Sequence, residues 1–416
     1  MNRVVVTGLG AITPIGNSAE DFWNNAIEGK SGAEKITKFD ATHFKTQFAC
    51  EVRDFSPELY LDKAEIRRND LFTQYALYAS SEAIGDSGFD FNGISPFEIG
   101  VIWGTGQGGM GSFEKEVAQY SSNRTNPRFS PFFVPKIIAN MASGMISIKY
   151  GLMGINYTTV SACASSNTAI MDAFNYIRLG KAKVIITGGS EAPITEASIG
   201  GFNAMKAMST NNHRPKEASR PYDIHRNGFV IGEGAGALIL EEYEHAKKRG
   251  AKIYAEITGA AMTADAFHIS APLESGVAAS RAMQMALREA KLNPEELDYL
   301  NAHSTSTPVG DIAEIKAIEA VFSKRGEKRL TVSATKSMTG HLLGAAGAIE
   351  AILCIKAINH KVIPPTINTK KVDPEIGDSL DIVLGEARDQ KVVASISNAF
   401  GFGGHNAVVV FKELNR

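Results

Sequence analysis

Cysteine is scarce in this sequence, with only three among 416 residues. A chain stabilised by disulfides carries a dense and usually even set of cysteines, so a disulfide scaffold is excluded. The chain is also long enough to bury a core without such cross-links. Free thiols are typical of a reducing compartment, and we therefore expect a cytoplasmic protein.

An excess of charge of one sign is lacking as well. The 43 basic and 45 acidic residues leave a formal net charge of −2, which gives no general attraction to nucleic acid or to an anionic membrane. Charged residues make up 21% of the chain, close to the globular average of about 25%, so a disordered chain is excluded. We expect neither a nucleic-acid partner nor a membrane partner.

Apolar runs of membrane-spanning length are also missing. The run at 4–12 is broken by a threonine and two glycines and is followed by Pro14, so we interpret it as a buried strand rather than a signal peptide. The most apolar later stretch, 341–358, contains Glu350 and Lys356. It falls short of about 20 uncharged apolar residues, so no membrane span is predicted.

What the sequence does contain is an alternation of short β-branched runs and amphipathic segments. Apolar residues recur in the latter at three- and four-residue steps, which predicts helices. Strands that alternate with helices and carry nearly continuous apolar residues predict an α/β fold with sheets covered on both faces. The predicted strands are 4–7, 99–103, 157–160, 184–187, 237–240, 253–257, 330–333, 392–396 and 407–411. The predicted helices are 21–28, 63–84, 134–150, 166–179, 276–291, 311–322 and 341–359.

The chain also shows signs of two similar halves. A charged passage near its middle is typical of a surface helix end, and a glycine-rich strand and turn closes each side, at 184–192 and 393–406. The length suggests more than one domain at about 150 residues each. We predict an N-terminal half at 1–250, with an insertion or contact region at about 110–135, and a C-terminal half at 251–416.

One glycine pattern resembles a dinucleotide site, because Gly104, Gly106 and Gly109 stand at GxGxxG spacing after a predicted strand. Such a site also needs a second strand and an acidic ribose ligand about 20 residues further on, and the next segment provides no such strand. We interpret the glycines as a tight turn between strand and helix, and we predict no bound cofactor.

The three cysteines differ in their surroundings. Cys50 and Cys354 lie among apolar residues and are interpreted as small core side chains. Cys163 follows the predicted strand 157–160 and precedes a long predicted helix, so the positive end of the helix dipole and free N–H groups face it. That environment favours the thiolate and lowers the thiol pKa. Position alone leaves Cys163 either a nucleophile or a third core thiol.

Two histidines, His303 and His341, are expected at the same edge of the sheet as Cys163. Each stands at the end of a predicted strand, where ligands collect in α/β folds. A zinc site from these three residues is not favoured, because no closely spaced ligand pair supports it. Taken alone, each histidine is more often structural. Two histidine donors would suit the stabilisation of a developing enolate or oxyanion. The glycine-rich segment 398–406 either presents backbone N–H groups beside the thiol or forms a plain hairpin turn.

Five longer motifs extend over the whole chain. They are VSACASS at 160–166, SRPYD at 219–223 with GFVIGEGAG at 228–236, NAH at 301–303 continuing to Asp311, TKSMTGHLLGAAG at 335–347, and NAFGFGG at 398–404. On these motifs the sequence resembles the β-ketoacyl-acyl-carrier-protein synthases of the elongating class, most of all the type II enzymes of dissociated fatty-acid synthesis.

This resemblance implies the thiolase fold, a duplicated αβαβα architecture of five layers with the active site where two similar halves meet, and it implies a homodimer. It further implies that Cys163 takes an acyl chain from acyl-carrier protein as a thioester. Malonyl-carrier protein would then lose CO2, and the resulting carbanion would attack that thioester to give β-ketoacyl-carrier protein.

The resemblance assigns the other catalytic roles to four positions. His303 and His341 would donate hydrogen bonds to the malonyl thioester oxygen, and the backbone N–H groups of Cys163 and Phe400 would form the oxyanion hole. Lys336 would be an electrostatic and structural partner, paired with Glu350. Because the carbanion arises by decarboxylation, no strong base is needed, which suits a site of cations and N–H donors.

Substrate and partner sites also follow from the resemblance. Phe400 would gate the acyl pocket, and Asp265 and His268 lie in a second loop that would move with it. The substrate-binding set is Thr305, Thr307, which would hydrogen-bond the 4′-phosphopantetheine arm, Phe400, Phe402, Gln107, Phe202, Asp265 and His268. The basic residues expected to dock the acidic carrier protein are Lys63, Arg67, Arg68, Arg128 and Lys206. A monovalent cation near Asn301, Glu350 and Asn398 is implied by the resemblance only, and no other metal is expected.

Two positions depart from the family pattern. Ser304 stands where the family usually has glycine, and a serine costs about 1 kcal/mol or more there if the position requires a positive φ. Gln107 stands where the family has an aliphatic residue that lines the acyl pocket, and a buried amide without a partner is costly. We therefore predict a preference for short, polar or unsaturated acyl primers.

Several functions remain open on the sequence. One is fatty-acid elongation, and another is a polyene or polyketide ketosynthase working with a chain-length partner that lacks the cysteine, which Ser304 and Gln107 make worth testing. A non-catalytic partner of a true synthase is disfavoured by the retained Cys163, His303 and His341. A degradative thiolase is disfavoured because it typically has cysteine at the position held here by His341.

Overall fold

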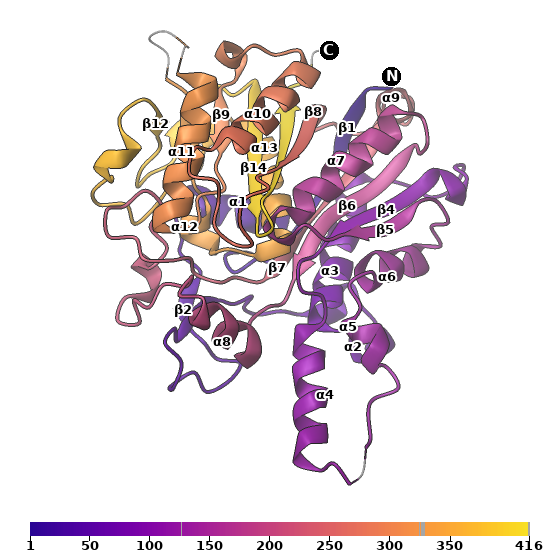
Figure 1. The fold of residues 1–416 in the computed structure, drawn as a ribbon. Helices are drawn as coiled ribbons and strands as arrows, with labels where there is room; N and C mark the ends of the chain where they lie inside the picture. The colour runs from indigo at the N-terminus through magenta and orange to yellow at the C-terminus, as the bar shows by residue number, and fades with distance from the viewer. Residues whose placement is uncertain (126, 324, 326–328, 415–416) are drawn as a thin grey trace.

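The computed structural model describes residues 1–416 except 126, 324, 326–328 and 415–416 (Figure 1). Its strands are β1 (Val4–Ile12), β2 (Ala33–Lys35), β3 (Phe48–Cys50), β4 (Ile99–Gly104), β5 (Asn156–Thr159), β6 (Val184–Glu191), β7 (Gly234–Glu242), β8 (Ala255–Ala264), β9 (Tyr299–Asn301), β10 (Thr331–Ser333), β11 (Val362–Ile363), β12 (Asp381–Ile382), β13 (Arg388–Asp389), β14 (Ala394–Gly401) and β15 (His405–Lys412). The large sheet has the order β12-β10-β9-β14-β15-β8-β1-β7-β6-β4-β5, and two small sheets pair β11 with β13 and β2 with β3.

The large sheet repeats one topology twice. The order β5-β4-β6-β7-β1 in the first part matches β10-β9-β14-β15-β8 in the second. In each part the first three strands are parallel and the last two pairings are antiparallel. The two parts meet where β1 pairs with β8. The duplicated α/β architecture predicted from the sequence is therefore correct, and we keep as a proposal the division at 250/251, between α9 (Tyr243–Lys248) and β8.

Helices form three layers around the two parts of the sheet (Figure 1). The helices α7 and α13 lie in the middle, with α7 packed on β4 and β6 and α13 packed on β14 and β7. On the outer faces, α3 covers β1 and β7, and α10 covers β8 and β15. The α-helices besides α9 are α1 (Ala19–Ile27), α2 (Lys63–Arg68), α3 (Leu71–Ser87), α4 (Met110–Ser122), α5 (Phe133–Ile137), α6 (Met141–Tyr150), α7 (Ser165–Arg178), α8 (Glu196–Ala204), α10 (Val277–Ala290), α11 (Pro308–Phe322), α12 (Lys336–Thr339) and α13 (Ala346–His360).

The middle helix α13 is the most apolar helical segment. The stretch Leu343–His360 is the one helical segment in the described part of the chain with the length and hydropathy of a membrane span. However, 89% of it is buried inside the protein. It is surrounded by strands of both parts of the sheet, so it forms the shared core of the two halves.

Three predicted helices differ from the structure. The helix expected at 63–84 is broken, because Asn69 is extended and the Asp70 carboxylate caps a new helix by accepting from the N–H of Phe72. The helix expected at 134–150 is divided into α5 and α6. The helix expected from residue 341 begins only at Ala346, after Gly340 (φ +69°) and a 3₁₀ turn.

The segment 110–135 forms an arm on the N-terminal part. Its first residues build the regular helix α4, which projects away from the body of the molecule (Figure 1). None of the side chains of α4 is buried. The sequence showed little periodicity here because this helix has no face packed on the core.

Candidate active site

A cavity of about 560 Å³ opens between the two parts of the sheet. The N-terminal part contributes Cys163 and the turn after β4, which carries Gly106. The C-terminal part contributes His303 and His341. The three residues that sequence reasoning placed at one sheet edge are thus brought together in one cavity.

Cys163 lies in a 3₁₀ turn, Ala162–Ala164, between β5 and α7. The residue is 8% exposed, and burial raises the pKa of its thiol to about 12, although Lys336 and the backbone N–H groups of Phe402 and Cys163 oppose this shift. The prediction of a lowered thiol pKa is therefore wrong. The loss of solvation outweighs the nearby helix N-terminus, so the resting protein holds a neutral thiol.

His303 and His341 stand face to edge. Their ring centroids are 5.3 Å apart and the ring planes are nearly perpendicular, at 86°. Burial and the charge of Lys336 lower the pKa of both rings well below the usual histidine value. Both rings are therefore neutral at physiological pH, as hydrogen-bond donors to a developing enolate need to be.

The backbone of each histidine is held by a different element. The His303 N–H donates to Glu314 Oε1 at 2.8 Å, and the His341 N–H donates to the carbonyl of Val230 at 2.7 Å. The Nδ1 atom of each ring is buried and has no hydrogen-bond partner among the described residues. A buried N–H without an acceptor is rarer than an unfilled acceptor, so we place the proton of each ring on Nε2, the nitrogen left to face the cavity.

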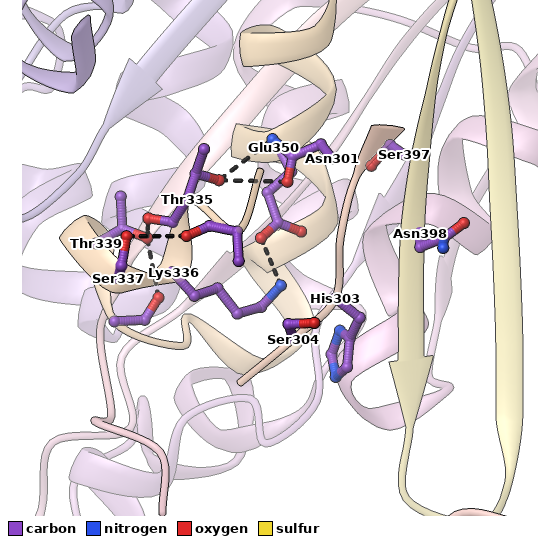
Figure 2. A network of polar contacts seen from close by, with 12 residues as sticks. Asn301, His303, Ser304, Thr335, Lys336, Ser337, Thr339, Glu350, Ser397 and Asn398 are labelled. Carbon is purple, nitrogen blue, oxygen red and sulfur yellow. Dashed lines mark hydrogen bonds and ion pairs between the residues drawn. The ribbon is translucent and has the colours of Figure 1, made fainter. Parts of the chain in front are cut away.

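Behind the histidines, Lys336 and Glu350 form an ion pair, as the resemblance implied (Figure 2). Both side chains are 1% exposed. Burial raises the pKa of Glu350 to about 7, and the ammonium group of Lys336 opposes this change. The same ammonium group helps to hold both histidines neutral.

Close to this pair lie the residues expected near a monovalent cation (Figure 2). The Asn301 side chain exchanges hydrogen bonds with Thr335 Oγ1. Three oxygens, Oε2 of Glu350, Oγ of Ser397 and Oδ1 of Asn398, are buried and without a partner among the described residues. Oxygen donors of this kind suit a hard cation, so these residues fit the implied ion. The described residues contain no group of three His, Cys, Asp or Glu side chains that could hold a metal.

The glycine-rich segment 398–406 is a hairpin between β14 and β15, and it also touches the nucleophile. The N–H group that acts on the thiol beside that of Cys163 comes from Phe402. Phe400, the predicted oxyanion donor, lies within β14 opposite Asn406, and its N–H group remains the predicted donor. A Cβ on Gly401 would lie 2.5 Å from the carbonyl oxygen of Ser161, so only glycine permits this close approach.

Both phenylalanines line the cavity. The Phe400 ring is 5.7 Å from that of His303. The Phe402 ring is 6.5 Å from that of Phe202, which also lines the cavity and packs on Phe229 at 5.3 Å. The aromatic residues of the predicted substrate set are therefore in place.

The second loop is tied to the hairpin through Asp265. Its N–H donates to the carbonyl of Gly404 at 2.8 Å, and its carboxylate accepts from Asn406 Nδ2 at 2.7 Å. Asp265 lines the cavity, whereas His268 is exposed and does not. The His268 Nδ1 accepts from two backbone N–H groups of its own loop, so the structure does not bring it to the site.

The remaining predicted residues lie at the cavity or on the surface. Thr305 and Thr307 line the cavity with their hydroxyls 3.2 Å apart. Among the basic residues, Lys206 is exposed and lines the cavity too. The others, Lys63, Arg67 and Arg68 on α2 and Arg128 after α4, are exposed and do not line it.

Two family models match the chain. The β-ketoacyl synthase N-terminal domain covers residues 1–246, and the β-ketoacyl synthase C-terminal domain covers residues 254–370. The chain belongs to the β-ketoacyl synthase family. It is 49% identical over 413 residues to a 3-oxoacyl-[acyl-carrier-protein] synthase 2 of Staphylococcus aureus, covering 99% of this chain and 98% of that one. A protein of the same name from Synechocystis sp. is 48% identical over 411 residues, with the same coverage.

Solved structures of this family have the same fold. A β-ketoacyl synthase from Burkholderia phymatum superposes with a TM-score of 0.92 at 34% identity over the full length of both chains. The ishigamide ketosynthase/chain length factor gives a TM-score of 0.92 at 33% identity, also over both full lengths. A ketosynthase of a type II polyketide system in complex with its acyl-carrier protein gives 0.88 at 31% identity.

The two departures from the synthase pattern have partners in the structure. Ser304 is not among the residues with positive φ, so the strain considered for it is absent. Its N–H and Oγ both donate to Glu314 Oε2, at 2.6 and 2.8 Å. Gln107 lines the cavity, and its Oε1 accepts from Ser198 Oγ at 2.9 Å. The sequence argument assumed an amide without a partner, whereas in the structure the Gln107 oxygen has one.

Sequence reasoning missed three polar residues of this synthase site: Glu191, Ser198 and Glu314. Glu314 lies 11 positions after His303 and binds its backbone. Glu191 ends the glycine-rich strand β6. A carboxylate within or directly after an apolar segment was the only sequence signal for either glutamate.

Proposed function

We propose that this β-ketoacyl synthase condenses an acyl group held on Cys163 with malonyl-acyl-carrier protein, giving β-ketoacyl-acyl-carrier protein and CO2 in fatty-acid elongation. The observation that carries this proposal is the meeting of one thiol and two neutral histidines in one cavity. The similarity to 3-oxoacyl-[acyl-carrier-protein] synthases over nearly the full chain supports it.

In the first half-reaction, the Cys163 sulphur attacks the thioester carbonyl of an acyl-carrier protein. The thiol proton passes to the departing pantetheine sulphur, so no permanent base is required. The N–H groups of Cys163 and Phe400 stabilise the oxyanion of the tetrahedral intermediate. A Cβ on Gly401 would lie 3.0 Å from the Cys163 nitrogen, so the backbone that follows Phe400 runs beside the nucleophile, which supports this choice of donors.

In the second half-reaction, the Nε2–H groups of His303 and His341 donate to the thioester oxygen of malonyl-carrier protein. As the C–CO2 bond breaks, its electron pair forms an enolate that these two donors stabilise. The carbanion carbon then attacks the thioester carbonyl on Cys163, and the cysteine sulphur leaves as a thiolate that takes a proton from solvent to restore the thiol. Lys336 acts at a distance by holding both histidines in the neutral donor form.

We infer that the enzyme binds no cofactor of its own and that its substrates are carried on the phosphopantetheine arm of the carrier protein. Thr305 and Thr307 bind this arm where they line the cavity, and Lys206 stands exposed beside the same cavity to attract an acidic carrier. A structural relative has been solved with its acyl-carrier protein. The basic surface residues that complete the docking patch are Lys63, Arg67, Arg68 and Arg128.

A monovalent cation would be held by Asn301, Glu350, Ser397 and Asn398. When bound, it would supply a fixed positive charge to oxygens that otherwise have no partner. The ion would stabilise the buried carboxylate of Glu350 next to Lys336, with no direct part in bond making.

We infer a cytoplasmic homodimer. The edge strand β5 ends the large sheet, and apolar side chains are exposed along the arm, α5, α6 and the end of β5. These side chains are Phe113, Val117, Phe129, Val134, Ile138, Ile148, Met153 and Val160. A second copy of the chain paired at this edge would cover them. Three free cysteines support a reducing compartment.

The substrate class is set at Gln107. Its amide lines the cavity beside Cys163 and is held by Ser198, so a long alkyl chain would have to pack against a polar group. We keep the prediction of short, polar or unsaturated primers. A polyene or polyketide pathway with a chain-length partner is the second candidate, and the likeness to the ishigamide ketosynthase/chain length factor favours it.

The decisive experiment is a condensation assay with malonyl-carrier protein and acyl-carrier proteins of increasing chain length. Wild type should condense short primers, and Gln107→Ile should gain activity on long saturated primers relative to wild type. The matched control is Ser198→Ala. This variant removes the hydrogen bond to the Gln107 side chain but keeps the amide in the cavity. Equal long-chain activity in wild type and Gln107→Ile would overturn the primer prediction, and a stable heterodimer after co-purification would favour the second pathway.

A further inference from the structure

Glu191 is a fully buried carboxylate at the end of β6, with 0% exposure. Its Oε1 accepts from Thr105 Oγ1 at 3.0 Å and from the N–H of Gln107 at 2.9 Å. Its Oε2 accepts from the N–H groups of Gly106 at 2.7 Å and Gly344 at 2.9 Å. An ionised carboxylate offers about four acceptor sites, and four are used here. Burial raises the pKa of Glu191, and these four hydrogen bonds oppose that shift. A protonated carboxyl would add an O–H with no acceptor, so the geometry favours the anion.

The four donors come from two segments that both form the reaction cavity. Thr105, Gly106 and Gln107 belong to the turn after β4, and Gly344 belongs to the 3₁₀ turn that follows His341 by two residues. A Cβ on Gly344 would lie 2.4 Å from the Gly106 nitrogen. The two turns therefore touch directly around the carboxylate, one from each half of the molecule.

Among the described residues, Glu191 makes no ion pair, whereas Glu350, another buried carboxylate close to the site, is paired with Lys336. A buried charge held only by hydrogen bonds acts on its surroundings over a longer range than a paired one. Burial is the main cause that raises the pKa of the Cys163 thiol; Lys336 opposes this shift and Glu191 adds to it. The other titratable groups that line the cavity are Lys206, Asp265, His303, Glu314 and His341.

We propose that Glu191 is a positioning residue that holds the turn beside Cys163 against the turn of His341, and that its negative charge adds to burial in disfavouring the Cys163 thiolate. This inference rests on the proposed function only for its turnover readout. The charge effect concerns the thiol alone and is measured without any condensation.

The test uses the full-length protein and two readouts. The first is the pH dependence of Cys163 alkylation by iodoacetamide, followed by intact mass. Cys50 and Cys354 are fully buried and serve as internal references. The second is turnover in the malonyl-carrier-protein assay. Glu191→Gln should move the alkylation midpoint to lower pH, raise the rate at a fixed pH severalfold, and lower turnover by about tenfold or more.

Two further variants separate charge from geometry. Glu191→Asp keeps the charge on a shorter side chain, so turnover should fall while the alkylation midpoint stays at the wild-type pH. Thr105→Ala removes one of the four donors and should also leave the midpoint unchanged. A folded Glu191→Gln with the wild-type midpoint overturns the charge effect, and wild-type turnover in both Glu191 variants overturns the positioning role.

If Glu191→Gln does not fold, Glu191→Asp decides. A wild-type midpoint with reduced turnover supports the proposal, and a midpoint moved to lower pH despite the retained charge contradicts it. Absence of condensation in the wild-type protein would count against the proposed function and leave the alkylation result to be judged separately.

Discussion

The two halves of the molecule have the same strand topology but carry different functional side chains. Their equivalent strands β5 and β10 lead to Cys163 on one side and to Lys336 and His341 on the other. The equivalent strands β4 and β9 lead to the turn of Gln107 and to His303. The N-terminal half thus provides the nucleophile and the acyl end, and the C-terminal half provides the donors.

The two halves also place charges of opposite sign near the cavity. Lys336 lies in the C-terminal half, where its charge adds to burial in lowering the pKa of both histidines, and it also favours ionisation of Cys163. The anion Glu191 lies in the N-terminal half, where it opposes ionisation of the thiol. A duplicated fold can therefore place two opposite charge environments on either side of one cavity without changing the backbone plan.

The largest effect is expected from removing the nucleophile of the N-terminal half. Cys163→Ser replaces the thiol by a far weaker nucleophile, so condensation should fall by a factor on the order of a thousand or more. Release of CO2 from malonyl-carrier protein should continue, because its donors lie in the other half. Separate measurements of CO2 and of β-ketoacyl product check this prediction. Cys354→Ser, a substitution at a core thiol, is the control. Equal loss of both products would contradict the assignment of the nucleophile and the histidine donors to different halves.

The converse substitutions remove the donors of the C-terminal half. His303→Ala and His341→Ala should each lower CO2 release by about 10²- to 10³-fold, the usual cost of one lost oxyanion donor. Alkylation of Cys163 by iodoacetamide should be retained in both variants. A histidine variant with normal decarboxylation would show that its ring does not serve the malonyl oxygen.

A third change tests the buried ion pair behind the histidines. Lys336→Met leaves the Glu350 carboxylate buried without its cation, and the free energy of unfolding should fall by about 3–5 kcal/mol. Urea denaturation measures this loss. The double variant with Glu350→Leu should recover most of the stability, and a single variant as stable as wild type would show that the pair is dispensable.

A smaller effect is expected at Ser304. Ser304→Ala removes one hydrogen bond to the buried carboxyl group of Glu314 and should lower the free energy of unfolding by about 1 kcal/mol. Ser304→Gly, which restores the usual family residue, should add only a small backbone penalty. Thermal and urea unfolding of the two variants should therefore nearly coincide, and activity should change little in either.

The smallest expected effect is on the pH profile. The pKa values of His303 and His341 lie well below 6.5, so CO2 release should not decline as the pH is lowered through that value. Stability should respond differently. Below pH 6.5 the unfolded chain binds protons that the folded histidines do not, so the contribution of these two histidines to the free energy of unfolding should decrease as the pH falls, and the variants His303→Ala and His341→Ala should lose this part of the pH dependence. An acid limb centred at 6.5 would indicate that the histidines are not shielded.

Much of this site could be predicted from the sequence because its residues follow strands. Cys163, His303 and His341 each stand after a β-branched run, and parallel topology brings such strand ends to one edge. The direction of the Cys163 pKa could not be predicted, because it depends on burial by chain segments far away in sequence. The partners Gln107–Ser198 and Ser304–Glu314 were missed for the same reason. The break at Asn69 in the predicted helix 63–84 was missed because apolar residues recur at helical spacing on both sides of it, so the helix-capping role of Asp70 could not be recognised.

The burial of α13 also has a consequence for synthesis. Four elements of the first half, α1, α7, β6 and β7, pack against α13, which begins at residue 346. About 100 residues must therefore be added after β7 before that face can be covered, which takes about 5–20 s at ordinary translation rates. During this interval the nascent first half exposes the apolar surface that α13 later buries.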